Sequence, residues 1–242
     1  MSLSGRGAIA IWNDIRPDTR ADFFEWHNRE HMPERVAIPG FRRGRRFGAV
    51  DAQPEFFTLY ETDGPEVLTG ADYLARLDNP TPWTRRVVVA FLNTSRSLCR
   101  VAMSLGPGEG GLIVTFRCEV AEELEEEMLR VLTEDALPRL ADRTGIVGAH
   151  LCLADRAASN VQTAEKKVRS EISRVPSWII FVEGGSDAEA LKSACDDALS
   201  SEALSAAGAI APIERGLYQL QYCRSPQDSR LAVQEAPKRN PA

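Results

Sequence analysis

Short apolar runs alternate with longer amphipathic segments through the first half of the chain. Runs rich in apolar and β-branched residues predict strands, and a repeat of about 3.6 residues predicts helices. The expected order is strand, helix, strand, strand, helix, strand, at residues 7–12, 19–34, 41–50, 55–62, 66–77 and 97–105. This βαββαβ order is typical of the ferredoxin-like fold. We therefore expect a first ferredoxin-like unit over residues 1–105.

The same order of elements returns after a glycine-rich linker at residues 106–111. The second series is predicted at residues 112–120, 121–140, 146–153, 178–183, 187–200 and 217–223, which gives a second unit over 112–224. A polar insertion at 154–175 stands where the first half has a four-residue hairpin, and we expect it to be exposed, partly helical or mobile. Residues 225–242 have the composition of a disordered tail.

The two halves also align directly. The first 12 residues of MPERVAIPGFRRG, from Met32, align without a gap with LPRLADRTGIVG, from Leu137, at an offset of 105 residues. This similarity predicts an internal duplication. Each unit leaves one face of its sheet uncovered, so two units can bury those faces against each other. The predicted fold class is therefore α+β, with two tandem ferredoxin-like units paired as an intramolecular αβ barrel; the alternative is two independent domains joined by the linker.

Composition narrows the classes of function. The 242 residues carry a net charge of −6, which argues against a nucleic-acid partner. No stretch approaches the about 20 apolar residues that a membrane span requires. The five cysteines are odd in number and without CxxC spacing, and the N-terminus lacks the pattern of a signal peptide. We therefore expect a cytoplasmic protein with reduced thiols.

One face of the predicted helix at 19–34 mixes apolar and polar groups. At 100° per residue this face collects Phe23, Trp26, His27, Glu30 and His31. In the second half the two histidine positions become Leu132 and Ala136, whereas Glu30 stays acidic as Asp135. The imidazoles are therefore not a requirement of the fold, and the carboxylate is interpreted as a structural hydrogen-bond partner.

The two histidines are the candidate catalytic residues. His31 stands in the last helical turn before Pro33, where a side chain can reach a cavity, and imidazole titrates near neutral pH as a general base requires. The alternative is a histidine satisfied within the core. His27 and His31 have the i, i+4 spacing of zinc-binding helices, but HNREH lacks the HExxH pattern and the third histidine, His150, is remote in sequence. We expect neither a metal nor another cofactor.

Trp26, Arg45, Tyr60 and Trp83 are candidate substrate-binding residues. Arg45 belongs to the cluster FRRGRRF at 41–47, where period 2 groups it with Arg43 and the two phenylalanines. An arginine pair there can hold an anionic group; the alternative is a solvated strand face that pairs with the acidic stretch at 122–127. Tyr60 and Trp83 carry aromatic rings with a polar atom, and Trp83 follows Pro82 in a segment that can cover a pocket; core packing is the alternative for both.

These residues carry a family resemblance. FFEWHNREHMPERVAIPGFRRGRRF, FFTLYETDGPEVLTGADYL and NPTPWTRR resemble the dimeric α+β barrel superfamily, which includes EthD-like proteins, antibiotic-biosynthesis-type monooxygenases, muconolactone isomerases and haem-binding dye peroxidases and chlorite dismutases. The resemblance covers most of residues 7–105. It implies a pocket between sheet and helices, and His31 looks like the helix-ending histidine of EthD-like members. No context matches the proximal histidine of the haem-binding branch.

The sequence thus favours a small-molecule enzyme or enzyme-like binder. We expect His31 to remove a proton from an apolar, aromatic compound without a cofactor, as in monooxygenase- or isomerase-like reactions. A non-catalytic barrel that binds a ligand or a protein partner is the alternative, and a haem or metal enzyme is the third class. Exposed sheet edges could pair with a second copy of the chain, so a homodimer is a further possibility.

Overall fold

Eight antiparallel strands close into a single barrel in the computed structural model, which describes residues 3–168 and 174–226. The strands are β1 (Gly7–Ile15), β2 (Phe41–Asp51), β3 (Phe56–Thr62), β4 (Phe91–Leu105), β5 (Leu112–Val120), β6 (Ile146–Ala154), β7 (Trp178–Gly184) and β8 (Ala209–Arg224). Around the barrel they follow the order β1-β3-β2-β8-β5-β7-β6-β4. Hydrogen-bonded registers join every neighbouring pair in this ring.

The two halves contribute equivalent sets of strands. The first half runs β4-β1-β3-β2 and the second β8-β5-β7-β6, so in each half the fourth strand lies beside the first, then the third, then the second. The seams between halves are β2–β8 and β4–β6. The α+β class and the antiparallel barrel are therefore confirmed, and the halves share one barrel instead of forming separate domains. Their origin by duplication stays a prediction.

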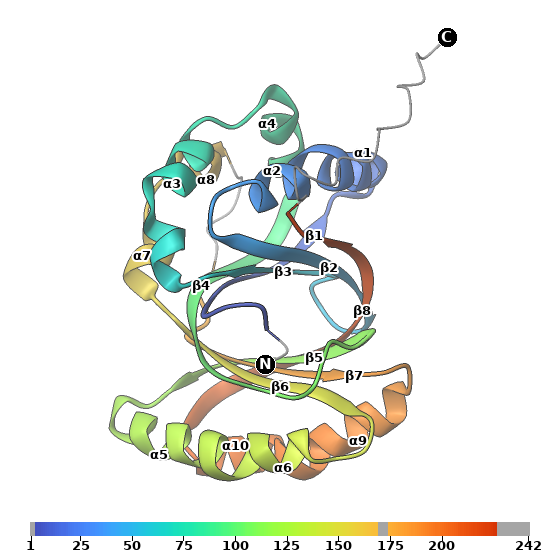
Figure 1. The fold of residues 1–242 in the computed structure, drawn as a ribbon, viewed down its shortest axis with the longest axis vertical. Coiled ribbons are helices and arrows are strands. Elements are labelled where there is room, and N and C mark those ends of the chain that lie inside the picture. Colours follow the sequence, from blue (N-terminus) through green and yellow to red (C-terminus); the bar gives the residue numbers. More distant parts are fainter. Residues whose placement is uncertain (1–2, 169–173, 227–242) are drawn as a thin grey trace.

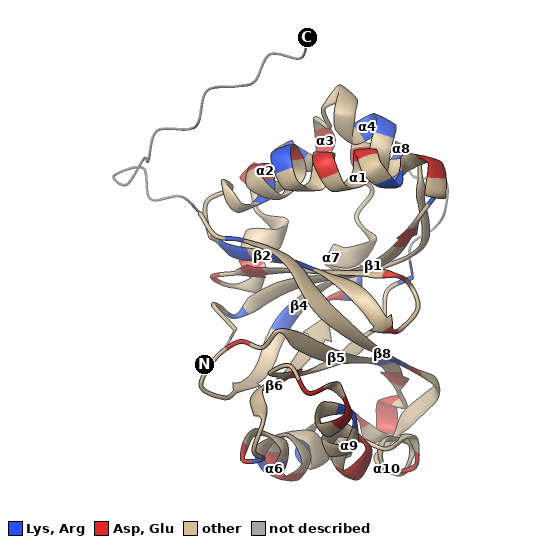
Figure 2. Cartoon of the chain, turned by 90° about the vertical axis from the view of Figure 1, so that its right-hand side faces the viewer, with Lys and Arg blue, Asp and Glu red and all other residues tan. Residues whose placement is uncertain are grey.

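Helices cover the barrel in two layers on opposite sides, as Figures 1 and 2 show. The helices are α1 (Arg20–Trp26), α2 (Met32–Val36), α3 (Ala71–Asp78), α4 (Pro82–Val88), α5 (Glu125–Arg130), α6 (Leu137–Ala141), α7 (Arg156–Asn160), α8 (Ala164–Val168), α9 (Ala188–Ala198) and α10 (Ser201–Ala206). Shorter turns are η1 (Pro17–Thr19), η2 (His27–His31), η3 (Pro65–Thr69), η4 (Glu122–Leu124) and η5 (Val131–Ala136). Helices α1 to α4 lie over the first half, and α5, α6, α9 and α10 over the second.

Side chains alternate between the barrel interior and the helix layers, as the period of a strand requires. In β1, Ala8, Ala10 and Trp12 join the interior cluster, whereas Ile9 packs toward the first helix layer. Trp12 stacks on Phe57 with ring centroids 4.8 Å apart. Large rings from both halves therefore fill the barrel, and its interior is a packed core and not a channel.

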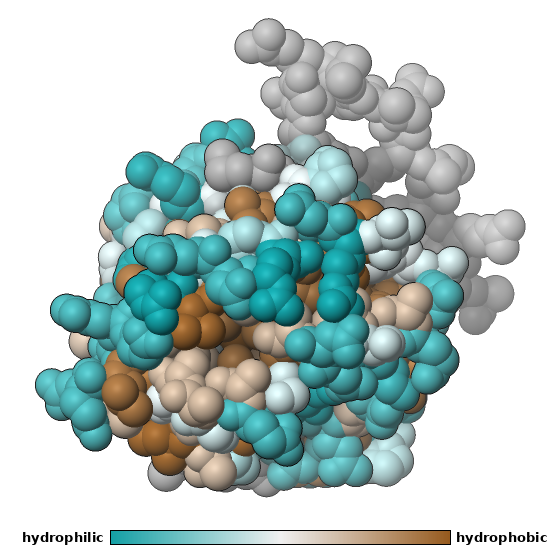
Figure 3. All heavy atoms as spheres, turned by 90° about the horizontal axis from the view of Figure 1, so that it is seen from below, coloured by the Kyte–Doolittle hydropathy of each residue, from teal (hydrophilic) through white to brown (hydrophobic). Residues whose placement is uncertain are grey.

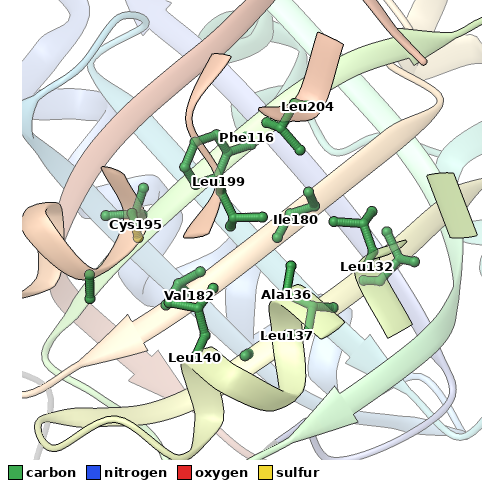
Figure 4. Packing of buried hydrophobic residues seen from close by; sticks show 14 of the residues in the cluster. Phe116, Leu132, Ala136, Leu137, Leu140, Ile180, Val182, Cys195, Leu199 and Leu204 are labelled. Atoms are coloured by element: carbon green, nitrogen blue, oxygen red, sulfur yellow. The ribbon is translucent and has the colours of Figure 1, made fainter. Parts of the chain in front are cut away.

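The second helix layer is apolar where it meets the sheet. Leu132, Ala136 and Leu137 pack with Ile180 and Val182 of β7, as Figure 4 shows. The outer surface of this layer mixes hydrophilic side chains with exposed hydrophobic ones (Figure 3). At the two positions that match the histidines, the second half thus carries only apolar packing.

Several element boundaries differ from the sequence-based expectations. Strands β4 and β8 begin at Phe91 and Ala209, earlier than expected. The polar run at 93–97 in β4 and Pro212 in β8 are not typical of a strand, so the sequence pattern did not predict these first residues. The expected helix at 66–77 divides into η3 and α3, and the segment after Thr81 is helix α4. The predicted tail lies outside the described residues from 227 onward, as does the part of the insertion at 169–173.

The described part of the insertion crosses from the second half onto the first. We call residues 156–168, which contain α7 and α8, the covering segment. Helix α8 packs against α3 and α4, and α7 packs against β4, on the same side of the barrel in Figure 1. The Ser159 hydroxyl accepts a hydrogen bond from the Leu98 backbone N–H at 2.9 Å. Because Ser159 and Glu165 are buried, the expectation of an exposed insertion is wrong for these residues.

Candidate functional site

The helix that carries the histidines widens into a π turn at the histidines. In η2 (His27–His31) the N–H of Met32 donates to the carbonyl of His27, five residues earlier. The imidazole rings stack with centroids 5.5 Å apart. A matching π turn, η5, occupies the equivalent place in the second half, where the N–H of Leu137 donates to the Leu132 carbonyl. The turn therefore belongs to both halves, whereas the imidazoles belong to one.

Both histidines line a small cavity between the first-half sheet and its helices. We call it the histidine cavity; its volume is about 20 Å³, room for about one water molecule. Its apolar walls include Ile9, Ile11, Trp26, Tyr73, Leu77 and Phe91. Its polar side chains include Asn13, His27, His31, Arg35, Thr58, Tyr60, Arg96 and Glu165. An aromatic enclosure with a few convergent polar groups is the usual form of a small-molecule site.

His31 lies against aromatic rings in this cavity and is 7% exposed. Its ring centroid is 4.2 Å from that of Trp26 and 6.5 Å from that of Tyr60. The Trp26 indole N–H donates to the Thr84 hydroxyl at 3.1 Å, which fixes the plane of the indole beside the imidazole. Trp26 and Tyr60 thus stand with His31 as the sequence analysis expected.

Tyr60 brings a buried hydroxyl to the cavity. Its Oη makes no hydrogen bond to another residue in the described parts of the chain. Burial raises the pKa of Tyr60 far above its usual value, with smaller effects from the charges around it. The phenol therefore stays protonated at neutral pH and can donate a hydrogen bond to a bound molecule.

His27 is held as a neutral imidazole. Arg46 Nη1 lies 3.1 Å from His27 Nδ1, and a guanidinium only donates, so Nδ1 accepts and the proton of the neutral ring is on Nε2. Burial, followed by the charges of His31 and Arg46, lowers the pKa of His27 well below 6.5. Burial also lowers the pKa of Arg46, to about 10, which leaves the arginine cationic at neutral pH.

The lowered pKa of His27 makes stability depend on pH. Above pH 6.5, the usual imidazole pKa, His27 is neutral in both the folded and unfolded chain and contributes no dependence. Below it, the unfolded chain takes up the proton first, so stability falls by up to about 1.4 kcal/mol per pH unit. We expect His27→Leu, which copies Leu132, to remove this slope in urea unfolding between pH 6.5 and 5. A slope unchanged in the variant, with a native near-UV spectrum at pH 7.5, contradicts this assignment.

Glu30 and Trp83 make hydrogen bonds that join the elements around the site. The Glu30 carboxylate accepts hydrogen bonds from the hydroxyls of Thr81 and Thr84, which ties η2 to the start of α4. This is the structural role expected for it. The Trp83 indole N–H donates to Asp22 at 2.8 Å, and its half-buried ring is not among the residues around the histidine cavity.

Arg45 lies on the other face of the sheet, inside the barrel. It donates to Glu183 at 2.7 and 2.9 Å and to Glu61 at 3.2 Å. Glu61 also accepts from Arg43 at 2.9 and 2.7 Å. Arg43 and Arg45 therefore pair with Glu61 and Glu183, and the alternative, a solvated strand face that pairs with residues 122–127, is wrong for these two arginines. Arg45 does not meet the histidines; on β2 it is Arg46 that does.

A bulge explains part of this arrangement. The register of β2 against β3 shifts between Phe41 and Arg43, so Phe41 packs toward the helices while Arg43 turns inward. Strict period 2 placed Phe41 with Arg43 and Arg45. The structure thus separates a ring that the sequence pattern had grouped with the two arginines.

Sequence analysis missed three charged residues of the cavity, namely Arg35, Arg96 and Glu165. Arg35 follows His31 by four residues, so the helical repeat gives a signal that places both on one face. Glu165 comes from the covering segment, 130 residues away, and forms a buried ion pair with Arg35. Nothing in the polar composition of the insertion indicates that contact.

The described residues contain neither a cluster of metal ligands nor a helix suited to span a membrane. Across residues 3–168 and 174–226, no three His, Cys, Asp or Glu side chains gather in a way that would hold a metal ion. Among the same residues, none of the helices has the length and apolar character needed to cross a membrane.

The fold defines a class of α+β barrel proteins, and solved structures share it. A protein described as anthrone oxidase-like superposes over 97% of this chain and 99% of its own, with a TM-score of 0.64 and 15% sequence identity. Two proposed monooxygenases match at 8% identity. The one from Fusobacterium nucleatum subsp. nucleatum has a TM-score of 0.56 over 92% of this chain and 96% of its own. The one from Lactobacillus acidophilus NCFM has a TM-score of 0.55 over 91% of this chain and 96% of its own.

Sequence comparison adds no closer relative. No protein-family model and no curated protein sequence matches the chain. At these identities the structural similarity shows the fold alone, and the chemistry has to be argued from the cavity.

Proposed function

We propose that the protein is a cofactor-independent enzyme that binds an aromatic small molecule at the histidine cavity and removes an acidic proton from it with His31. The observation that carries this proposal is a buried imidazole against an indole, with ring centroids 4.2 Å apart. The same cavity holds a buried tyrosine hydroxyl that makes no hydrogen bond to a described residue. Aromatic walls suit a planar ligand, and the polar atoms suit its oxygen.

The chemistry follows from these groups. His31 takes a proton from a carbon next to a carbonyl or from a phenol, and the electron pair left behind spreads onto the carbonyl or ring oxygen. Tyr60, which stays protonated, donates a hydrogen bond to that oxygen and stabilises the anion. His27, neutral and oriented by Arg46, packs beside His31 without adding a second positive charge.

Two outcomes of the anion balance without a bound cofactor. If the proton returns to a different carbon, the product is an isomer and no co-reactant is used. If dissolved dioxygen oxidises the anion, a methylene group becomes a carbonyl group and one water forms from the second oxygen atom. The anthrone oxidase-like neighbour suggests that aromatic ketones with an acidic methylene group are the first substrates to test.

We infer also that the chain is an antibiotic-monooxygenase-like or EthD-like barrel whose two halves arose by duplication. The equal strand order, the paired π turns and the glycines with positive φ at Gly40 and Gly145, 105 residues apart, support this inference. The second half then supplies the barrel partner and has lost, or never gained, the imidazoles.

Anthrone in deuterated buffer tests the proposed function. We expect the protein to accelerate exchange of the methylene protons, followed by NMR, with a rate that saturates as anthrone increases. Oxygen consumption measured in parallel separates oxidation from isomerisation. Saturable binding without exchange favours a non-catalytic ligand-binding barrel, and absence of both binding and exchange for anthrone contradicts the proposal.

A further inference from the structure

A buried ion pair joins the covering segment to the histidine cavity. Arg35 of α2 donates to Glu165 of α8, and their side chains are only 4% and 6% exposed. Arg35 comes from the helix that follows the two histidines, whereas Glu165 comes from the second half of the chain. A charge this buried needs a partner, and Glu165 is the one acid among the described residues that line the cavity.

Glu165 of α8 lines a second hollow as well as the histidine cavity. This outer hollow, about 60 Å³ in volume, is also lined by Leu68, Leu74, Leu98, Val161 and Lys166. Tyr73, Leu77, Arg96 and Glu165 line both spaces. Withdrawal of α8 would therefore join them into one site with apolar walls.

Of the walls of the histidine cavity, the covering segment is the one that can move most easily. The strands behind the histidine cavity belong to a closed ladder of backbone hydrogen bonds. Helix α8 has five residues, and its first N–H is held by an exposed carboxylate, Asp78, at 3.0 Å. As it stands, the histidine cavity holds about one water molecule, so an aromatic ring enters only if a wall moves.

The side chains that line the histidine cavity and the outer hollow carry more positive than negative charge. Their described linings contain Arg35, Arg96 and Lys166 but a single acidic side chain, Glu165. Nη1 of Arg35 makes no hydrogen bond to a described residue, even with Glu165 in place. When Glu165 leaves, the planar guanidinium stays buried on α2 with both terminal nitrogens open, a geometry that suits a carboxylate.

We propose that the natural ligand of this site is an aromatic carboxylate whose carboxyl group takes the place of Glu165 on Arg35 while its ring fills the joined hollows. This inference rests on the proposed function for the place of the ligand, and it adds the class of the ligand and the residue that selects it. Glu165 thus occupies the anion position when the site is empty and competes with the ligand for it.

Equilibrium binding of 2-naphthoate and 2-naphthamide tests this inference. The two compounds have the same ring system and similar size, but only the first is anionic at pH 7.5. We expect calorimetry on the wild-type protein to show naphthoate binding at least about tenfold more tightly than naphthamide. Glu165→Gln removes the competing carboxylate and should strengthen naphthoate binding by roughly a further tenfold. Glu202→Gln, an exposed acid on α10, is the matched control and should leave both affinities unchanged.

Variants of Arg35 complete the experiment. Arg35→Gln should abolish the preference for naphthoate; if that variant does not fold, Arg35→Lys, which keeps the charge but loses the planar fork, should reduce it. Equal affinity for the two compounds in wild type and Glu165→Gln overturns the inference, as does binding of neither. His31→Ala should keep the preference for naphthoate. If this variant also exchanges anthrone protons at the wild-type rate, the proposed chemistry fails while the inference about the ligand class stands.

Discussion

Replacement of Arg45 by methionine should lower the free energy of unfolding at pH 7 by about 3–5 kcal/mol. Arg45 lies inside the barrel, 1% exposed, and donates to Glu183 and Glu61 from opposite halves of the chain. Without it these carboxylates remain buried with less compensation, and a buried charge left uncompensated is costly. Urea unfolding followed by tryptophan fluorescence measures the change.

The dependence on pH identifies the cause. Burial alone would raise the pKa of Glu183, but the hydrogen bond from His150 and the charge of Arg45 outweigh it and lower the pKa to about 2. This carboxylate therefore contributes stability above its usual pKa of 4.5, and the contribution is lost as pH falls from 4.5 toward 2. We expect the deficit of Arg45→Met to shrink over the same range.

A matched surface variant is the control. Arg42 lies on the same strand as Arg45, and Arg42→Gln breaks its exposed ion pair with Asp63. This change should lower the free energy of unfolding by less than about 1 kcal/mol. A loss of similar size in both variants, or a deficit that does not change with pH, would mean that the buried charges do not hold the two halves together.

Replacement of His31 by alanine should slow proton abstraction by about 10²–10⁴-fold, the usual contribution of a general base. His31 is the imidazole that shares the cavity with the Trp26 ring and the Tyr60 hydroxyl, whereas the other imidazole, His27, already accepts from Arg46 through Nδ1. The measurement is the exchange rate of anthrone methylene protons by NMR.

Arg29→Gln is the control for this variant. Arg29 lies in the same π turn but on its exposed side, paired with Glu25, and its replacement should change the rate by less than about twofold. If His31→Ala binds anthrone and exchanges its protons at the wild-type rate, His31 is not the base and the proposed mechanism fails.

The fold was accessible from the sequence because local signals agreed with one another. Apolar runs, the helical repeat and the alignment of the segments that begin at Met32 and Leu137 all predicted two series of the same elements, and the barrel combines them. The strand ends were harder: a single sequence does not show that β8, which contains Pro212, pairs first with β5 and then with β2. Seams of a barrel depend on long-range pairing and not on local pattern.

The site was predicted in part, and the missing part depends on tertiary contacts. The comparison of His27 and His31 with Leu132 and Ala136 indicated the helix face that lines the histidine cavity. Arg45 was assigned to the same pocket because period 2 gives the faces of a strand but not which face meets which helix. Glu165 had no signal at all, since its role depends on where the covering segment packs.

The ring of strands also bears on assembly. Every described strand has a neighbour on both sides, so the exposed edges on which a further dimer was expected are absent from residues 3–168 and 174–226. A homodimer, if one forms, has to use another surface.

The covering segment exists once per molecule and reaches only one of the two helix layers. In an assembly of two identical chains, every change to such a segment would appear twice, at both sites, and any defect would be doubled as well. A single chain with two unlike halves escapes that coupling. Selection can therefore reshape the covering segment over α3, α4 and β4 while the opposite layer continues to evolve for packing alone.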